Sequence, residues 1–266
     1  MKVIDQLGNT VQLAYSPKRI ISVVPSQTEL LFDLGLDEEI IGITKFCIHP
    51  KEKTKSKQKI GGTKKLDIEK IISLNPDLII ANKEENDKAQ IELLATKFPV
   101  WISDVVTLDD AYQLIIQLGI IVGKEQKARE LVDNIKNSFA SLLQPKSDVQ
   151  HQLKNKTVAY LIWSNPYMCA GSNTFINYIL ESCLLLKNIV AHSVSRYPEI
   201  TAADLKASNP DFIFLSSEPF PFKEKHLHEL QQICPTATIK LVDGELFSWY
   251  GSRLQRTPNY LENLLF

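Results

Sequence analysis

The first half of the chain alternates short aliphatic runs with segments whose apolar positions recur at helical spacing. Apolar runs of this length predict strands that are covered on both faces, as in a parallel sheet. After an N-terminal hairpin that turns at Gly8-Asn9, strands are expected at residues 19–24, 40–44, 78–81 and 100–102. Helices between these strands predict βαβ units and a mostly parallel sheet.

Polar residues mark the expected helix starts in this half. Ser26 is followed three residues later by Glu29, which is the spacing of a capping box, in which each side chain bonds the other's backbone N–H. A helix is therefore predicted to open at Ser26. Further helix starts are expected at Asp67 and at Thr107, the latter with Asp110.

The pattern is helical only from residue 107 to about residue 143. Gly119 and Gly123 are expected to loosen the first of these helices. Residues 125–143 then carry an apolar stripe of period 3.6 that is about five turns long. A polar stretch with Pro145, residues 144–156, reads as a boundary.

Strand–helix alternation resumes beyond this boundary. Strands are expected at residues 157–163, 212–215 and 239–242, and helices from Ser172, around 223–233 and after Pro258. Residues 67–80 of the first half are echoed by residues 201–214 of the second, with Asn-Pro-Asp at the same place in both. Although Asn-Pro-Asp is also a common connector, the length of the echo predicts two related α/β lobes, 1–122 and 155–266, joined by a bridging helix and linker at 123–154.

Composition excludes several classes of function. A chain of 266 residues with 44% hydrophobic and 23% charged residues is long enough for two soluble domains. Its net charge of −1 gives no basic face for a nucleic acid. No apolar run reaches the 18 or more residues of a membrane span.

Two features bear on the compartment. The N-terminal residues lack the apolar region and cleavage site of a secretory signal, so we expect either a periplasmic or cell-surface chain whose signal has been removed, or a cytoplasmic protein. The four cysteines have no tight pairing pattern and are expected to be free thiols, which leans towards a reducing compartment: Cys47, Cys169, Cys183 and Cys234.

Three segments, by their order and spacing, resemble one family. They are residues 25–35, Gly61-Gly62 with residues 67–80, and residues 165–172. Together they resemble the helical-backbone (class III, TroA-like) solute-binding proteins of ABC importers for cobalamin, haem and ferric siderophores, with the cobalamin binders closest in pattern. The resemblance implies two α/β lobes bridged by one helix and a metal chelate held in the cleft between them. It also implies a monomer that serves a membrane permease, with no catalysis and no intrinsic cofactor.

The first lobe offers two groups of candidate ligand-binding residues. Ligands of open α/β sheets bind beyond the carboxyl ends of the strands, where Ser26 and Gln27 open a helix whose N-terminus suits an anionic group; plain capping is the alternative. In cobalamin-binding relatives the loop after the second strand presents aromatic side chains, and Phe46 and His49 fall at what look like those positions. Cys47 and His49 are also metal-ligand types, and His49 is the better candidate, but pocket lining is favoured for both.

The second lobe adds candidate residues, most of them aromatic, from two expected loops. They are Trp163, Tyr167 and Cys169 in the first, and Phe247, Trp249, Tyr250 and Arg253 in the second. Flat aromatic walls suit a planar macrocycle, and an arginine suits a carboxylate or phosphate on its periphery; the alternative for each single aromatic is packing. Trp101 falls in a strand and is expected in the core.

Charged segments are given surface roles. Two charged segments are expected to be solvated loops: residues 51–65, with seven lysines, and residues 82–86. Attraction of an anionic chelate is the secondary alternative for the first, and lining of the cleft is the alternative for the second. The resemblance implies that one acidic residue on the outer face of each lobe docks on the permease. Glu69 matches the first position, whereas the second is Ala203 with Asp204 beside it, so symmetrical docking stays open.

Other function classes remain as alternatives. An enzyme is not expected, because the chain has no nucleophile elbow, Walker lysine loop, His-Glu-x-x-His or dinucleotide fingerprint. A receptor for bare zinc or manganese needs three or four converging ligands, and of five histidines only His49 falls in an expected cleft loop. A cytoplasmic binder or sensor of the same chelate is the third possibility.

Overall fold

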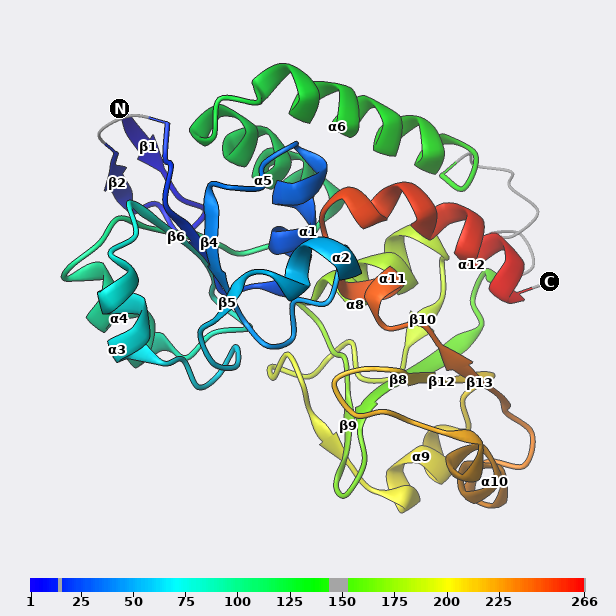
Figure 1. Ribbon diagram of the computed structural model, residues 1–266. Helices are drawn as coiled ribbons and strands as arrows, with labels where there is room; N and C mark the ends of the chain where they lie inside the picture. Colours follow the sequence, from blue (N-terminus) through cyan, green and yellow to red (C-terminus); the bar gives the residue numbers. More distant parts are fainter. Residues whose placement is uncertain (14–15, 144–152, 266) are drawn as a thin grey trace. The chain divides into compact units, whose positions relative to one another are not determined.

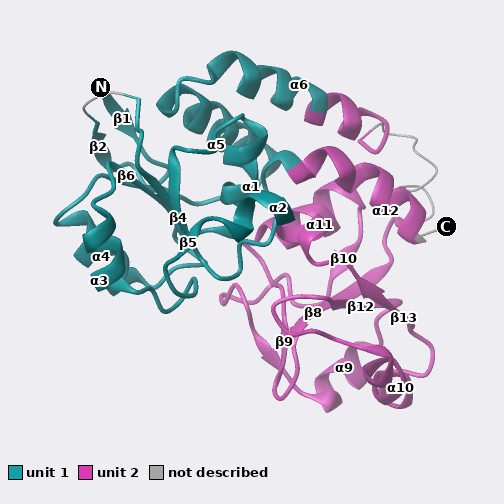
Figure 2. Cartoon of the chain, in the orientation of Figure 1, with its two compact units in different colours: residues 1–134, 250–252 teal, residues 135–249, 253–266 magenta. Residues whose placement is uncertain are grey.

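The structure is a computed structural model that describes residues 1–13, 16–143 and 153–265. The chain forms two compact units: unit 1 is Met1–Asn134 with Tyr250–Ser252, and unit 2 is Ile135–Trp249 with Arg253–Phe266 (Figure 2). Each unit has its own sheet flanked by helices, and the chain passes from one unit to the other within helix α6, Glu125–Ala140. The predicted two-lobed α/β class is confirmed, while most of the predicted boundary stretch 144–156 lies outside the described residues.

Unit 1 contains a hairpin and a parallel sheet of five strands in the order β5-β4-β3-β6-β7 (Figure 1). The hairpin strands are β1 (Lys2–Ile4) and β2 (Thr10–Gln12), and Gly8 turns between them at φ 84°. The sheet strands are β3 (Ile20–Ser22), β4 (Ile40–Ile43), β5 (Gln58–Lys59), β6 (Leu78–Asn82) and β7 (Val100–Ser103). The helices are α1 (Pro25–Asp33), α2 (Lys51–Lys55), α3 (Ile68–Leu74), α4 (Lys88–Ala95) and α5 (Leu108–Ile121).

The core of unit 1 lies on both faces of this sheet. Ile21 and Ile79 pack with Ile71 of α3 and Leu94 of α4, and all four side chains are buried. Alternate strand residues point to the opposite face, where α1 and α5 lie (Figure 1). Because both faces are covered, the strands are apolar throughout, which is the pattern from which they were predicted.

Helix α5 runs through Gly119 without a break. A Cβ at Gly119 would lie 2.3 Å from the Cβ of Ala128 in α6, so the glycine allows the two helices to approach closely. The helix ends before Gly123, which adopts φ 69°. The expected loosening at Gly119 is therefore wrong, because the missing side chain serves helix packing there.

Unit 2 has a mixed sheet in the order β11-β9-β8-β12-β13, with β10 also pairing with β8. Strands β8, β10, β12 and β13 are parallel, whereas β9 runs antiparallel to β8 and to β11. The strands are β8 (Thr157–Trp163), β9 (Tyr167–Cys169), β10 (Lys187–Asn188), β11 (Glu199–Ile200), β12 (Phe212–Ser216) and β13 (Thr238–Val242). The helices are α8 (Phe175–Tyr178), η1 (Ile179–Cys183), α9 (Ala202–Ser208), α10 (Glu224–Ile233), α11 (Glu245–Ser248), η2 (Ser252–Arg256) and α12 (Thr257–Leu265).

The unit 2 sheet is also covered on both faces. Leu161 and Leu215 pack with Leu205 of α9 and Leu230 of α10. On the other face, the ring centroid of Tyr160 lies 5.0 Å from that of Phe247, and Tyr160, Phe214 and Phe247 are fully buried. Two sheets with separate cores explain why the strand–helix pattern appears twice in the sequence.

The Asn-Pro-Asp echo ends a helix in the same way in each unit. Asn75 and Asn209 form the C-caps of α3 and α9 in the left-handed conformation, at φ 45° and 40°. Asparagine is among the few non-glycine residues that adopt this conformation readily, and the proline that follows cannot continue the helix.

The aspartates of the echo tie the helix-to-strand connection to the central strand. Asp77 accepts hydrogen bonds from the backbone N–H groups of Lys18 (2.7 Å) and Arg19 (2.9 Å), just before β3. Asp211 accepts one from the N–H of Thr157 (2.8 Å), the first residue of β8. Asp77 and Asp211, called the aspartate clamps below, show that the sequence echo is a structural repeat.

The predicted capping box at Ser26 is wrong. Helix α1 begins at Pro25, its N-cap is Val24, and no side chain caps it. Proline at the first position of a helix has a suitable φ and no N–H to satisfy, so the helix starts one residue before Ser26 and places that residue inside the first turn. The caps predicted at Asp67 and at Thr107 are confirmed.

Several boundaries differ in unit 2. The helix expected from Ser172 begins at Phe175, capped by Thr174, and the segment after β8 is a hairpin with β9 instead of a loop. The second expected loop contains part of α11 and of η2. Helix α6 ends at Ala140, three residues before its expected end. The differences at β9, α8, α11 and η2 arise because these elements are only three to five residues long, which is too short for a hydrophobic period to be seen in the sequence.

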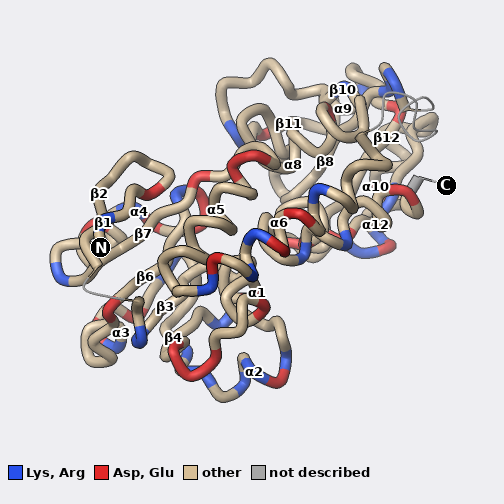
Figure 3. Tube along the Cα trace, turned by 90° about the horizontal axis from the view of Figure 1, so that it is seen from above, with Lys and Arg blue, Asp and Glu red and all other residues tan. Residues whose placement is uncertain are grey.

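The two charged segments of unit 1 are more ordered than expected for solvated loops. Residues 51–65 contain α2 and β5, and Lys57 Nζ lies 2.8 Å from the Asp37 carboxylate. In residues 82–86, the side chains of Asn82 and Asn86 are buried. Charges of both signs are interspersed along both units (Figure 3). Within the described ranges no helix is long and apolar enough to cross a membrane.

Candidate functional site

The first turn of α1 follows the central strand of the unit 1 sheet and buries two candidate residues. Ser26 and Gln27 are 3% and 0% exposed. Gln27 Nε2 donates to Ser103 Oγ, but neither Gln27 Oε1 nor Ser26 Oγ has a hydrogen-bond partner within the part of the chain that the structure describes. Buried polar atoms without partners are uncommon, and each costs about 1–3 kcal/mol.

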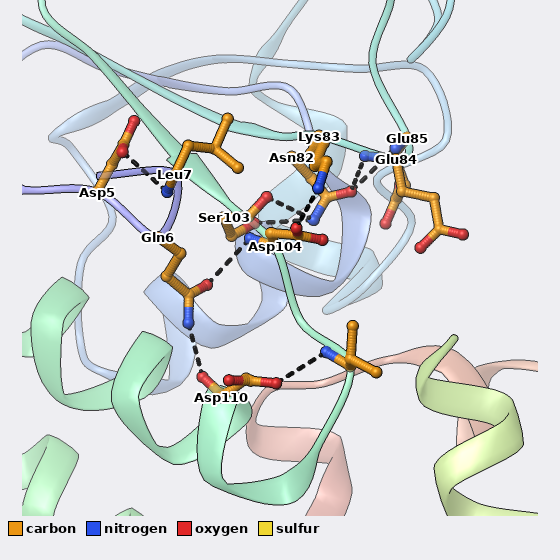
Figure 4. A network of polar contacts seen from close by, with 11 residues as sticks. Asp5, Gln6, Leu7, Asn82, Lys83, Glu84, Glu85, Ser103, Asp104 and Asp110 are labelled. Carbon is orange, nitrogen blue, oxygen red and sulfur yellow. Dashed lines mark hydrogen bonds and ion pairs between the residues drawn. The ribbon is translucent and has the colours of Figure 1, made fainter. Parts of the chain in front are cut away.

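The loops after β6 and β7 are held by a polar network (Figure 4). Asn82 Nδ2 donates to the hydroxyl and carbonyl oxygens of Ser103, at 2.9 and 3.1 Å. Its Oδ1 accepts the backbone N–H groups of Glu84 (2.8 Å) and Glu85 (2.9 Å). Asn82 therefore shapes a turn, and its side chain is occupied within the fold.

The same network connects to the N-terminal hairpin. Gln6 Oε1 accepts the N–H of Asp104 at 3.2 Å, and Gln6 Nε2 donates to the carbonyl oxygen of Asp110 at 2.9 Å (Figure 4). Lys83 pairs with Asp104, and Asp5 accepts the N–H of Leu7. The ends of β6 and β7 are thus rigidly supported.

The loop after β4 exposes one candidate and buries another. Phe46 is 51% exposed, and Lys45 Nζ lies 5.0 Å from its ring centroid. Cys47 is 1% exposed, with its sulfur 3.2 Å from the hydroxyls of Thr28 and Thr44. Burial raises the pKa of the Cys47 thiol, which favours the protonated form that does not ligate metals. His49, near the end of this loop, is half-buried.

Tyr250 belongs to unit 1 although it lies near the end of the chain. It is 5% exposed, and its hydroxyl lies 3.5 Å from a Glu85 carboxylate oxygen. At the next residue, a Cβ on Gly251 would lie 3.1 Å from the carbonyl oxygen of Ser26. This segment therefore packs against the first turn of α1.

In unit 2, Trp163 is the last residue of the central strand β8 and is 40% exposed. Its ring centroid lies 5.6 Å from that of Phe220, which follows β12. The Phe220 N–H donates to the carbonyl oxygen of Ile162 at 3.3 Å, so the Phe220 segment is fixed beside the end of β8. Phe220 was missed from the sequence, although the run Glu218-Pro-Phe-Pro-Phe222 directly after a strand is a signal of an aromatic loop.

Tyr167 and Cys169 lie in β9. Tyr167 is half-buried, and burial raises the pKa of its phenol. Cys169 is fully buried against the core that includes Leu205 and Leu230, and burial raises the pKa of its thiol to about 12. All four cysteines are free, as expected.

The residues expected in the second loop of unit 2 have two kinds of surroundings. Phe247 lies in the core, whereas Trp249 and Arg253 contact each other. Phe247 is fully buried beside Tyr160. Trp249 is 7% exposed, and its Nε1 donates to Glu218 Oε1 at 2.8 Å. Arg253 stacks on the Trp249 ring, with Cζ 4.9 Å from the centroid. Glu218 was missed because its contacts come from residues about thirty positions away.

Other features of the described residues lie apart from these candidates. A cavity of about 790 Å³ in unit 1 lies between the hairpin, α4 and β7, and none of the twelve expected ligand-binding residues lines it. Among the residues that the structure describes, no three His, Cys, Asp or Glu side chains gather to hold a metal ion.

The two expected docking residues lie at matching helix starts. Glu69 is exposed in the first turn of α3. Asp204 is exposed in the first turn of α9, where its carboxylate accepts the backbone N–H (2.9 Å) and the hydroxyl (2.7 Å) of Thr201. The Asp204 carboxylate is therefore already part of a capping box.

The arrangement resembles known binding proteins in both sequence and fold. The model of the family described as periplasmic binding protein matches residues 20–239. The chain belongs to the periplasmic binding protein family. An uncharacterized ABC transporter substrate-binding lipoprotein of Bacillus subtilis, YvrC, is 29% identical over 79% of this chain and 67% of its own length. The vitamin B12-binding protein of Pectobacterium atrosepticum is 24% identical over 90% of this chain and 85% of its own length.

A solved structure shows the same fold. The periplasmic haem-binding protein RhuT of Roseiflexus sp. RS-1 superposes with a TM-score of 0.78, at 22% identity, over 93% of this chain and 96% of its own. The resemblance stated from sequence motifs is confirmed. As a member of this family the protein is a solute binder and not an enzyme, and its small molecule is a ligand instead of an intrinsic cofactor.

Proposed function

We propose that the protein is the substrate-binding component of an ABC importer and captures a metal chelate. A cobalamin-like corrinoid is the favoured ligand, followed by haem and then a ferric siderophore. The vitamin B12-binding relatives and the haem-binding structural neighbour support this class of ligand.

The exposure of Phe46 and Trp163 carries the proposal. Among the described phenylalanines and tryptophans, only these two are exposed, at 51% and 40%. Each stands at or just beyond the carboxyl end of a parallel strand, β4 in unit 1 and β8 in unit 2, which is where α/β sheets bind ligands. Exposed aromatic rings at these two places supply apolar, flat surface for a macrocycle.

The remaining candidates are proposed with narrower roles. Tyr167, Trp249 and Tyr250 supply further aromatic surface, and Arg253 attracts an anionic group on the ligand's periphery. Ser26 and Gln27 offer polar contacts at the start of α1. Four further residues are proposed to support the site without ligating metal: Cys47, Cys169, His49 and Phe247. Of these, His49 is the best candidate for a metal ligand, so its substitution tests this assignment.

A titration tests the function directly. The purified protein is titrated with hydroxocobalamin, hemin and ferrichrome, and binding is followed by the visible spectrum of the ligand and by tryptophan fluorescence. Saturable binding of one of them at one equivalent is expected, with quenching because Trp163 is near the ligand. Failure to bind any of the three rejects the proposal. Tight binding of bare Zn²⁺ or Mn²⁺ instead would favour the bare-metal receptor.

The partner and compartment follow from the same proposal. An importer subunit acts in the periplasm or on the cell surface and delivers its ligand to a membrane permease, with Glu69 and Asp204 as the docking residues. Cell fractionation of the full-length protein tests this location. Recovery in the cytoplasm with chelate bound would favour a binder or sensor that is not coupled to transport.

A further inference from the structure

Three segments of unit 2 meet at the indole ring of Trp249. Glu218 lies two residues beyond β12, Trp249 directly follows α11, and Arg253 is in η2. The Trp249 side chain has contacts to both of the others. A ring fixed by three segments has a defined orientation before any ligand arrives.

A half-buried carboxylate, that of Glu218, holds the edge of the ring. Trp249 Nε1 donates to Glu218 Oε1 at 2.8 Å, and Ser248 Oγ donates to the same oxygen at 3.1 Å. Burial raises the pKa of the Glu218 carboxyl, and the Trp249 N–H opposes that rise. An indole N–H only donates, and a carboxylate acceptor makes such a bond short and strong.

An ion pair holds the face of the ring. The Arg253 guanidinium lies 4.9 Å from the Trp249 centroid, and its Nη1 lies 2.9 Å from Glu245 Oε2. The side chains of Arg253 and Glu245 are only 8% and 17% exposed, so both the cation–π contact and the ion pair are poorly screened by water. Pairing with Glu245 keeps the guanidinium over the ring.

The backbone is adapted to this cluster at Gly244, the N-cap of α11. A Cβ at Gly244 would lie 2.4 Å from Ser216 Oγ and 2.7 Å from Glu218 Cγ. Only a glycine lets α11 begin directly against the Glu218 stem. The short helix thereby delivers Trp249 to the carboxylate.

We propose that Glu218 is a positioning residue of the ligand site: it fixes the rotation of the Trp249 ring so that the ring packs on the chelate in one orientation. This inference rests on the proposed function, in which Trp249 contacts the chelate. Glu218 acts through the ring and does not itself touch the ligand. Ordering a side chain before binding removes part of the entropy cost of association.

Two variants separate the hydrogen bond from general packing. Glu218→Leu removes the acceptor, and Glu218→Gln keeps an oxygen that accepts the same N–H. We expect Glu218→Leu to raise the Kd about tenfold or more, as for loss of a hydrogen bond to a charged group, and Glu218→Gln to stay within about threefold. The probes are hydroxocobalamin, hemin and ferrichrome, and Glu224→Leu, at an exposed glutamate of α10, is the matched control.

The indole N–H resonances report the position of the ring directly. The chain has three tryptophans and therefore three such signals in a ¹H–¹⁵N spectrum, and Trp249→Phe assigns one of them. Glu218→Leu should shift the Trp249 signal and leave those of Trp101 and Trp163 in place. Shifts of all three would show a general disturbance of the fold and contradict positioning.

A double-mutant cycle decides whether Glu218 acts through Trp249. In a Trp249→Phe background, Glu218→Leu should have no further effect on the Kd. An equal loss in both backgrounds overturns the proposal, as does unchanged affinity when the indole signal has moved. If the wild type binds none of the probes, the proposed function itself fails, which is a different result from a wild type that binds and a Glu218→Leu variant that binds equally well.

Discussion

Trp163 and Phe46 differ from the other described tryptophans and phenylalanines in how much of the ring reaches solvent. Trp101 is fully buried and Trp249 nearly so, whereas Trp163 keeps 40% of its surface exposed at the end of β8. An exposed ring contributes little to the core and much to any ligand that covers it. Mutation of such a ring can therefore separate a contribution to ligand binding from a contribution to the stability of the core.

Trp163→Ala should weaken ligand binding by about 1–3 kcal/mol, because one stacking surface is lost. Its free energy of unfolding should change little, since the ring is already partly solvated. Fluorescence titration and urea unfolding measure the two quantities. Val194→Ala, at a fully exposed aliphatic residue, is the control. Unchanged affinity would remove Trp163 from the site.

His49→Ala tests whether the half-buried histidine after β4 ligates metal. We expect the visible spectra of the ligand bound to wild type and to His49→Ala to coincide at saturation, because pocket lining leaves the metal's axial position unchanged. A displaced band that added imidazole restores would show that His49 is a ligand.

Residue type and local position predicted these aromatic candidates, but not their surroundings. Trp163 is recognisable because it ends an apolar strand in a segment with Asn-Pro-Tyr. The partners of Trp249 are not recognisable, because Glu218 comes from a different strand end. Hydrogen bonds between distant loops depend on the fold and leave no period in the sequence.

At the scale of elements, the aspartate clamps make the same connection twice. Asp211 accepts the Thr157 N–H at the start of β8, and this hydrogen bond lowers the pKa of its carboxyl. A lowered pKa in the folded state means that the stabilisation is present at neutral pH and is lost as the pH falls through that pKa.

Asp211→Asn should therefore reduce the free energy of unfolding by about 1–2 kcal/mol at neutral pH and by much less at an acidic pH below the lowered pKa, where the wild-type carboxyl is itself protonated. Urea unfolding at both values measures the difference. An equal loss at both values would show that the charge of Asp211 is irrelevant to the clamp.

Asp77→Asn is the matched control for this prediction, because it makes the same change in unit 1. Hydrogen exchange should accelerate around β8 and β12 in Asp211→Asn, and around β3 and β6 in Asp77→Asn. Acceleration of both units by either variant would mean that the two cores unfold together.

Elements were predictable where a period or a cap was long enough to see. Apolar runs predicted the sheet strands β3, β4, β6, β7, β8, β12 and β13, and spacing predicted the Asp67 and Thr107 caps. The Ser26 box failed because Pro25 starts the helix without a capping side chain. The sequence did not predict β5, β9, β10 and β11, since strands of two or three residues are ordered by the neighbouring strand and not by their own pattern.

At the scale of the whole molecule, the matching starts of α3 and α9 bear on the permease. Glu69→Ala should lower ligand-dependent stimulation of the permease ATPase without changing the Kd for the ligand, because the exposed carboxylate is expected to contact only the partner. Reconstituted transporter and the binding titration measure the two effects. Stimulation that is unaffected would exclude Glu69 from docking.

Asp204→Ala tests whether unit 2 also docks on the permease. Its carboxylate caps α9 through Thr201, so some loss of stability is expected from the cap alone. A loss of ATPase stimulation comparable to that of Glu69→Ala would show docking by both units. An effect confined to stability would assign recognition to the Glu69 side.

The assignment of Tyr250–Ser252 to unit 1 has a consequence for synthesis. A chain that emerges from the ribosome in order completes the unit 1 sheet early, but the segment that packs Gly251 against Ser26 arrives only after nearly all of unit 2. The nascent first half thus lacks its final closure throughout translation.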